Sequence, residues 1–312
     1  MILAADIGGT KIAAARITGD GDLDGAVLTT PTPADQGPQA ILAALVGLLE
    51  QLGGTDVIGV GVSTAGVVDT TTGTITTATT SLRGWSGTPV AAVVSERIGL
   101  PVHVLNDGLA FGVGESVYGL GSRLRGTGGR VPSMLLVVVG TGIGGAIVVG
   151  DDPWLGARGV AGHVGHVPVP EADGLPCPCG RTGHVEAVGG GAGLLAAYHR
   201  GGGDRSVGSA REVLAAAQTP GEDQQVALTA VRRSATAVGR VAGGLANVLD
   251  PDLVVFAGGL TQGGPLWWEP ARSAYRQTLL DALRGLPLEV STGGVLTALR
   301  GVGRYSWRRI TT

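Results

Sequence analysis

Two segments of the chain, residues 2–17 and 135–149, share one local pattern. Each contains an apolar strand, a turn rich in glycine and threonine, and a second apolar strand. Glycine suits such turns because a backbone without Cβ atoms can bend tightly and let other groups approach closely. The repeated hairpin indicates a duplicated lobe, and a length of 312 residues is sufficient for two lobes.

The two turns have the chemistry of anion-binding loops. The first is Asp6-Ile7-Gly8-Gly9-Thr10-Lys11, and the second is Gly140-Thr141-Gly142-Ile143-Gly144-Gly145. Backbone N–H groups of glycines can approach an anion, while Thr10 adds a hydroxyl donor and Lys11, the only lysine in the chain, adds a cation. An ordinary hairpin turn would use the same glycines. Neither turn fits a Walker A loop, and both lead into strands, which excludes a dinucleotide-binding strand–turn–helix.

Strands and helices alternate along the rest of the chain, which predicts an α/β fold. Helical spacing of apolar residues is found at 39–52 and through most of 209–249. We expect another helix from about residue 270 to 283 and a last one within 293–312.

Composition excludes several classes of protein. Lys and Arg total 22 against 25 Asp and Glu, so no basic surface for nucleic acid is expected. The densest apolar run, residues 134–139, is far shorter than the roughly 18 residues that cross a bilayer. The N-terminus has no signal-peptide pattern, and two cysteines are too few for a disulfide scaffold. We therefore expect a cytoplasmic protein that does not bind a membrane.

Two histidines and both cysteines form a spacing typical of a metal site. His166 precedes Cys177-Pro178-Cys179-Gly180-Arg181-Thr182-Gly183-His184-Val185-Glu186. Zn²⁺ binds thiolate and imidazole in a tetrahedron, and His166, Cys177, Cys179 and His184 supply two ligands of each kind. The alternative is a pair of buried thiols without metal. Four protein ligands close the coordination sphere, so the zinc would be structural.

A third glycine element follows the predicted strand 253–256 and ends at Gly258-Gly259, where adenine or ribose could lie against backbone. The order of the three elements, near residues 10, 140 and 258, resembles the two phosphate motifs and the adenosine motif of the sugar-kinase and actin-like ATPase superfamily. The resemblance implies an α/β, two-lobed, ribonuclease H-like fold with a central cleft for nucleotide and sugar. The lobes expected are 1–118, with the helix at about 294–312 packed back on it, and 119–293. The resemblance also implies that ATP binds to Asp6, Gly8, Gly9, Thr10, Lys11, Thr141, Gly142, Gly144, Gly145, Gly258 and Gly259.

Asn106 and Asp107 follow the predicted strand 102–105. A carboxylate at a strand end can accept the proton of a sugar hydroxyl as that oxygen attacks the γ-phosphate of ATP. Out of context, the same dipeptide would be an ordinary Asn-Asp turn.

Nearly the whole chain, from Asp6 to about Leu260, resembles the ROK family of repressors, open reading frames and kinases. The family's Cys-Xaa-Cys-Gly-Xaa-Xaa-Gly-Cys-Xaa-Glu signature stands here at 177–186, with His184 in place of the third cysteine. The resemblance makes Asp107 the catalytic base. It implies that His166 binds zinc through one ring nitrogen and sugar through the other. The implied sugar-binding residues are Gly66, Asn106, Asp107, His163, His166 and Glu186.

Besides His184, two positions depart from the common family pattern. His163 stands where the family usually has Glu, and Ser81 stands where many members have Asn. In Ala161-Gly162-His163-Val164-Gly165-His166 and Cys179-Gly180-Arg181-Thr182-Gly183 the chain is more similar to bacterial N-acetylmannosamine kinases.

The function expected from the resemblance is ATP-dependent phosphorylation of the 6-hydroxyl of N-acetylmannosamine, with Mg²⁺ bound to ATP. Glucokinase or another hexose or N-acetylhexosamine kinase is the alternative. A non-catalytic sugar sensor is the alternative from another class. A DNA-binding repressor is disfavoured because the first hairpin starts at residue 2, which leaves no space for a helix-turn-helix. The family is often dimeric or tetrameric, so a homodimer or homotetramer is expected.

Overall fold

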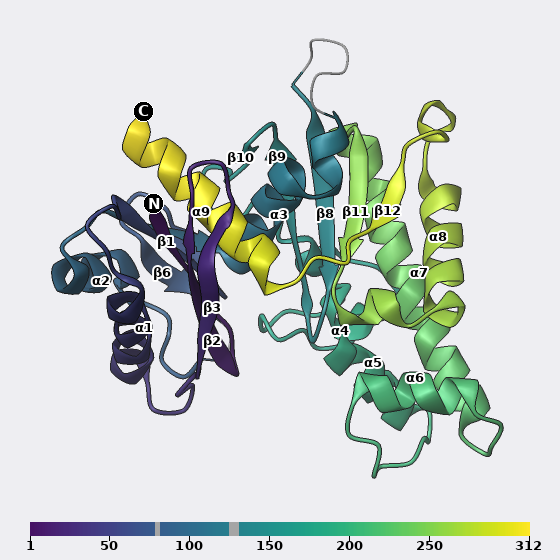
Figure 1. Ribbon diagram of the computed structural model, residues 1–312. Helices are drawn as coiled ribbons and strands as arrows, with labels where there is room; N and C mark the ends of the chain where they lie inside the picture. The colour runs from purple at the N-terminus through teal and green to yellow at the C-terminus, as the bar shows by residue number, and fades with distance from the viewer. Residues whose placement is uncertain (79–81, 125–130) are drawn as a thin grey trace. The chain divides into compact units, whose positions relative to one another are not determined.

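The computed structural model describes residues 1–78, 82–124 and 131–312 (Figure 1). The chain forms two compact units. The first comprises residues 1–132, 146–161 and 293–312, and the second comprises 133–145 and 162–292. The first unit therefore includes 119–132 and 146–161, which the sequence-based division assigns to the C-terminal lobe. Within the described ranges, no helix has the length and apolar character that crossing a membrane requires.

The first unit is built on a five-stranded sheet of order β3-β2-β1-β4-β7. Its strands are β1 (Ile2–Ile7), β2 (Lys11–Ile17), β3 (Leu23–Pro31), β4 (Gly59–Thr64) and β7 (Val102–Asn106). The three strands β1, β2 and β3 pair antiparallel, whereas β4 is parallel to both β1 and β7. The carboxyl ends of β1, β4 and β7 consequently meet at one edge of the sheet. Open α/β sheets bind ligands at such an edge.

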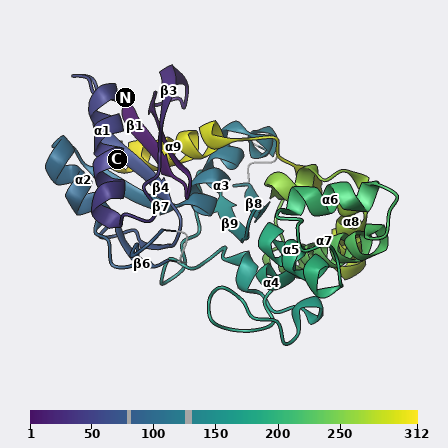
Figure 2. The same cartoon turned by 90° about the horizontal axis from the view of Figure 1, so that it is seen from below.

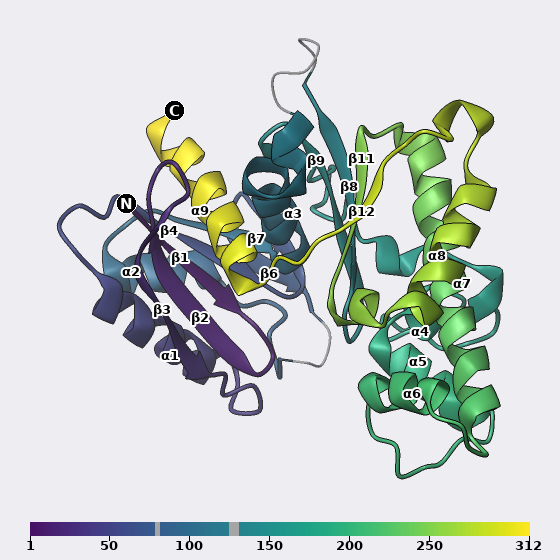
Figure 3. The ribbon, with the colours of Figure 1, turned by 45° about the vertical axis from the view of Figure 1, so that its right-hand side comes forward.

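Helices α1 (Pro38–Leu52) and α2 (Val90–Ile98) share an apolar core with one face of this sheet. Val60 and Val62 of β4 belong to that core. The alternating glycines of β4 lie against the C-terminal helix α9 (Val295–Thr311), because a Cβ at Gly61 would lie 2.6 Å from Ser306 Oγ (Figure 3). The period of two along a strand thus gives each face of the sheet its own helix layer.

Helix α3 (Asp107–Tyr118) packs closely on α9 within the first unit. A Cβ at Gly301 would collide with the carbonyl oxygen of Ala110, and one at Gly114 would collide with that of Thr297. The two backbones therefore touch at glycines, which accounts for two of the 57 glycines in the chain. A small antiparallel ribbon, β5 (Val67–Asp69) and β6 (Thr74–Thr77), also belongs to this unit.

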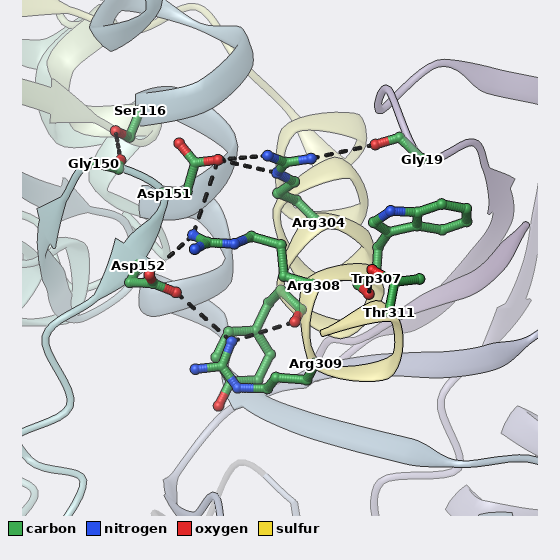
Figure 4. A network of polar contacts seen from close by, with 11 residues as sticks. Gly19, Ser116, Gly150, Asp151, Asp152, Arg304, Trp307, Arg308, Arg309 and Thr311 are labelled. Atoms are coloured by element: carbon green, nitrogen blue, oxygen red, sulfur yellow. Dashed lines mark hydrogen bonds and ion pairs between the residues drawn. The ribbon is translucent and has the colours of Figure 1, made fainter.

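A network of ion pairs ties α9 to the segment around β10 (Asp152–Pro153), as Figure 4 shows. Arg304 donates to Asp151 Oδ2 from Nη2 at 2.7 Å and from Nε at 3.1 Å. Arg308 Nη1 donates to Asp152 Oδ2 at 2.9 Å. Asp151 is only 13% exposed and Arg304 28%, so this pair is less screened by solvent than the half-exposed Asp152 contact.

The second sheet has the order β10-β9-β8-β11-β12. Its longer strands are β8 (Ser133–Val139) and β9 (Ile143–Val149), and β8, β11 (Leu253–Ala257) and β12 (Leu288–Val290) run parallel. The helices of the second unit are α4 (Glu186–Gly189), α5 (Gly191–Arg200), α6 (Ala210–Gln218), α7 (Gln224–Leu249) and α8 (Pro265–Thr278), seen together in Figure 2. The long helices α7 and α8 pack closely, since a Cβ at Gly243 would lie 2.7 Å from the carbonyl oxygen of Tyr275.

One expectation about helices is wrong, and one helix was not predicted. The helix expected to continue to residue 283 ends at Thr278, because Leu279 is extended (φ −65°, ψ 142°) and only a 3₁₀ turn follows at Asp281–Leu283. Helix α3 was not predicted, since its three glycines weaken the helical signal.

Candidate functional site

The first group of predicted site residues lies at the carboxyl ends of the parallel strands of the first unit. Asp6 of β1 stands opposite Ser63 of β4, and Ser63 Oγ donates a hydrogen bond to Asp6 Oδ1 at 2.7 Å. Burial raises the pKa of Asp6, while the Ser63 hydrogen bond and the charge of Lys11 act in the opposite direction. Ser63 is fully buried and was not among the expected site residues. Its role depends on strand register, which no local sequence signal reveals.

The first glycine turn is closed by a hydrogen bond from Gly8 N–H to the carbonyl of Lys11 at 3.0 Å. Thr32, just after β3, supports the turn from outside by donating from its N–H to Thr10 O and from Oγ1 to Gly8 O, at 3.0 and 2.7 Å. Gly9, Thr10 and Lys11 remain exposed. The turn is therefore held by its carbonyl groups, and three of its predicted ATP-binding residues are accessible.

Asn106 ends β7 and caps α3. Its Oδ1 accepts hydrogen bonds from Gly108 N–H at 2.9 Å and Leu109 N–H at 3.4 Å, while its Nδ2 donates to Gly66 O at 2.9 Å. Asn is a favoured N-cap because its side-chain oxygen satisfies the open N–H groups of the first helical turn. Gly66 has φ 104°, a conformation that strains residues with side chains. Asn106 thus fixes both the Gly66 turn and the start of α3, where Asp107 is the first helical residue.

Asp107 is an exposed residue. The protein around it nevertheless removes part of the hydration of its carboxylate. This desolvation, together with the negative charge of Asp6, raises the pKa of Asp107 to about 6. Hydrogen bonds from backbone N–H groups, including Gly108 N–H at 2.8 Å, limit the rise. A carboxylate with such a pKa is ionised at neutral pH and still basic enough to take up a proton.

The second group of predicted residues lies in the second unit, around the turn between β8 and β9. Gly140 N–H donates to Gly142 O at 3.0 Å and closes this turn. The first residues of α5 hold it, because Gly191 N–H donates to Gly140 O at 2.8 Å and Ala192 N–H donates to Thr141 O at 3.0 Å. These two residues of α5 were not expected from the sequence.

The third glycine element lies beside this turn. Strand β11 is parallel to β8, with Ala257 opposite Val138, so both strands end at the same edge. Gly258 has φ 98°, and a Cβ there would lie 2.5 Å from the carbonyl oxygen of Val139. The structure therefore brings Gly258 to the start of the second turn, and Gly259 follows it at the beginning of a 3₁₀ turn.

The four expected metal ligands converge in the second unit. One ligand atom from each of His166, Cys177, Cys179 and His184 lies within 4.8 Å of the others. Cys177 Sγ is 3.7 Å from His166 Nδ1, and Cys179 Sγ is 3.3 Å from His184 Nδ1. A tetrahedral Zn²⁺ with bonds of about 2.3 Å to sulfur and 2.0 Å to nitrogen separates its ligands by roughly 3.3–3.8 Å. The donor set and these two Cys–His separations therefore fit zinc.

The remaining predicted sugar-binding residues lie close to the four expected metal ligands or among them. His163 and His166 have stacked rings with centroids 6.4 Å apart. With its Nδ1 facing Cys177, His166 has Nε2 left for another partner. Glu186 begins α4, and its Oε2 accepts a hydrogen bond from Ile143 N–H in the second glycine turn at 3.1 Å.

The loop that carries the four expected metal ligands is also held by helix α7, which the sequence did not indicate. Arg240 of α7 donates to Glu171 Oε1 at 3.0 Å, and Arg233 Nε donates to the Glu171 carbonyl at 2.8 Å. The position of Ser81, which departs from the family pattern, lies outside the described residues.

Comparison with known proteins shows the relationship of this chain. Residues 2–302 match the model of the ROK family. A glucokinase of Streptomyces coelicolor is 32% identical over 301 residues, covering 90% of this chain and 88% of that protein. An N-acetylmannosamine kinase of Shigella flexneri is 33% identical over 266 residues, covering 84% of both.

A ROK family glucokinase from Streptomyces griseus, solved in complex with glucose and AMPPNP, has a TM-score of 0.78 and 28% identity. The alignment covers 97% of this chain and 98% of that one. The expected α/β fold of the actin-like ATPases is confirmed. The chain therefore belongs to the ROK family and is one of its sugar kinases.

Proposed function

We propose that this kinase transfers the γ-phosphoryl group of ATP to the 6-hydroxyl of N-acetylmannosamine. The observation that carries the choice of sugar is His163, half-buried beside His166, at the position where the family usually has Glu. A neutral imidazole donates as well as accepts hydrogen bonds, whereas a carboxylate only accepts. An N-acetyl group at C2 presents a carbonyl acceptor, so a donor at this position suits it better than Glu.

In the proposed reaction, Asp107 removes the proton of the 6-hydroxyl as that oxygen attacks the γ-phosphorus and the bond to the β-phosphate oxygen of ADP breaks. The backbone N–H groups of both glycine turns and the ammonium of Lys11 bind the phosphates. Mg²⁺ arriving with ATP would neutralise phosphate charge near Asp6. Gly258 and Gly259 would lie against the nucleoside.

The four-ligand cluster is proposed to hold one structural Zn²⁺ through His166, Cys177, Cys179 and His184. Bound zinc would supply folding free energy to a loop that has little regular structure of its own. The loop then holds His163, His166 and Glu186 in place for the sugar. The same family resemblance leads us to propose a homodimer or homotetramer, which light scattering after gel filtration would test.

The test of function is a panel of N-acetylmannosamine, N-acetylglucosamine, glucose and mannose, each assayed with ATP-Mg²⁺ by coupled ADP release. N-acetylmannosamine is expected to give the highest kcat/KM. A higher value for glucose would support the alternative, a glucokinase. The 32% identity to the Streptomyces coelicolor glucokinase, close to the 33% identity to the Shigella flexneri N-acetylmannosamine kinase, keeps this alternative in the test. Sugar binding without turnover of any member would support the non-catalytic sensor instead.

The pH dependence of kcat/KM should report the raised pKa of Asp107. The base acts only when ionised, so activity is expected to rise as pH increases through about 6 and to level off above it. An ordinary aspartate would give an acid limb near pH 4. Initial rates from pH 4.5 to 8.5, with the coupling enzymes kept in excess, measure this limb. A limb centred at pH 4 would contradict the assignment.

His163→Glu should shift specificity toward glucose. We expect the ratio of kcat/KM for N-acetylmannosamine to that for glucose to fall by about tenfold or more, the effect of losing one or two hydrogen bonds. His163→Gln is the matched control, since it keeps an uncharged donor and acceptor and should change the ratio much less. An unchanged ratio in His163→Glu would show that this position does not select the sugar.

A further inference from the structure

The carboxylate of Glu186 lies against the second glycine turn as well as belonging to the predicted sugar-binding set. Besides accepting the Ile143 N–H, its Oε2 lies 3.1 Å from the position that a Cβ of Gly142 would occupy. A Cβ on Gly165 would lie 2.9 Å from the same oxygen. The carboxylate therefore packs between the backbones of two segments, and glycine at 142 and 165 leaves the space for it.

The second glycine turn is held at its carbonyl groups by one set of hydrogen bonds and at an N–H group by another. Backbone N–H groups of α5 bind the carbonyls of Gly140 and Thr141, as described above. Glu186 binds the turn at an N–H group and through a side chain. A phosphate-binding turn binds its anion through N–H groups whose directions are set by the turn conformation. A side chain that binds one of these N–H groups can therefore control the turn.

The position of Glu186 is set by the loop that carries the metal ligands. The preceding residue, Val185, is buried, and its N–H donates to Val167 O at 2.9 Å. His184, one of the four clustered residues, forms an isolated antiparallel β-bridge with Pro168. The backbone just before Glu186 is thus fixed to residues 167 and 168, next to His166. This backbone position lets the Glu186 side chain reach Ile143.

The geometry points to Glu186 as a positioning residue for the second phosphate turn. Oε2 holds the Ile143 N–H, and Oε1 is left to accept a hydrogen bond from a sugar hydroxyl, so that turn and sugar share one carboxylate. A sugar bound to Oε1 restrains the carboxylate and with it the turn, so sugar and nucleotide bind with positive coupling. The coupling rests on the proposed function, whereas the contact between Glu186 and the turn does not.

The test compares Glu186→Ala with Glu186→Gln. Without sugar, Glu186→Ala should weaken binding of AMPPNP-Mg²⁺ by about tenfold, because the turn loses a hydrogen bond to a charged group. Glu186→Gln keeps an oxygen that accepts the Ile143 N–H and should stay within about twofold of the wild type. Both variants should weaken sugar binding. Calorimetry with each ligand alone, and with AMPPNP at saturating sugar, measures these constants and the coupling.

Hydrogen exchange at the Ile143 amide is the second measurement, and it requires no ligand. Exchange should be faster in Glu186→Ala than in the wild type and little changed in Glu186→Gln. Glu186→Asp, whose shorter carboxylate withdraws from the turn, should behave like the alanine variant and replaces it if that variant does not fold. Equal exchange in all variants, or unchanged nucleotide affinity in Glu186→Ala, would overturn the inference. A wild type that binds no nucleotide would contradict the proposed function, and the exchange result alone would then decide the role of Glu186.

Discussion

Replacement of Asp107 by Asn is expected to reduce kcat by about 10²–10⁴-fold, the contribution of a well-placed general base. Asn has the same size and can still accept the hydrogen bond that Gly108 N–H donates to Asp107 Oδ1. It cannot take up the proton of the 6-hydroxyl. The geometry at the start of α3 should therefore survive while proton transfer is lost. Steady-state kinetics with saturating sugar and ATP measure the decrease.

Two further measurements separate this role from a structural one. Sugar affinity of Asp107→Asn, determined by calorimetry, should stay within a few-fold of the wild type, because the remaining sugar contacts are intact. The acid limb near pH 6 should also disappear from the residual activity, since the titrating group is gone. Asp20→Asn, at an exposed turn, is the control and should keep full activity. Loss of sugar binding together with turnover would count against the assignment of the base.

Loss of the metal cluster should be the other large effect. Protein purified without chelator is expected to contain about one zinc per chain, and His184→Ala should contain far less. The variant should lose sugar affinity by more than tenfold, because the loop that holds His163, His166 and Glu186 loses its ligated ion. Its melting temperature should fall by about 4–8 °C, which corresponds to roughly 2 kcal/mol for a protein of this size.

His184→Cys is the matched variant for this prediction. It restores the third cysteine of the family signature and provides another zinc ligand, so metal content and sugar affinity should be kept. The contacts of Glu171 with Arg233 and Arg240 lie outside the cluster and should preserve the rest of the loop in both variants. Metal analysis, calorimetry and thermal unfolding give the three readouts. A gently purified wild type without bound metal would rule the zinc site out.

Local patterns in the sequence were sufficient for the elements that carry their own signal. The strands on both sides of each glycine turn and the helices at 38–52 and 295–311 agree with expectations from periodicity. The four residues expected as metal ligands also come together in space, as their spacing predicts. The signals are local because turn conformation depends on glycine and because ligand spacing follows the short reach of a loop. The family resemblance added the fold of the actin-like ATPases.

Helix α3 shows where local patterns fail. Its sequence contains glycines that weaken a helix on their own, and Asn106 suits a sugar-binding site as well as a helix N-cap. The helix is stable because Gly114 lets the backbone of α9 approach, nearly two hundred residues later in the chain. The end of α8 at Thr278 was not predicted either, because the apolar residues that follow it continue the helical pattern in the sequence.

The sequence by itself determined which chemical groups this protein has: two glycine turns, an aspartate after a strand, and two histidines with two cysteines at metal-ligand spacing. Only the tertiary structure decided how these groups are tuned. Strand register placed Ser63 on Asp6, and chain packing raised the pKa of Asp107 and placed Glu186 on Ile143. The reason is physical: hydrogen bonding and desolvation depend on neighbours in space, and those neighbours are far apart in the chain.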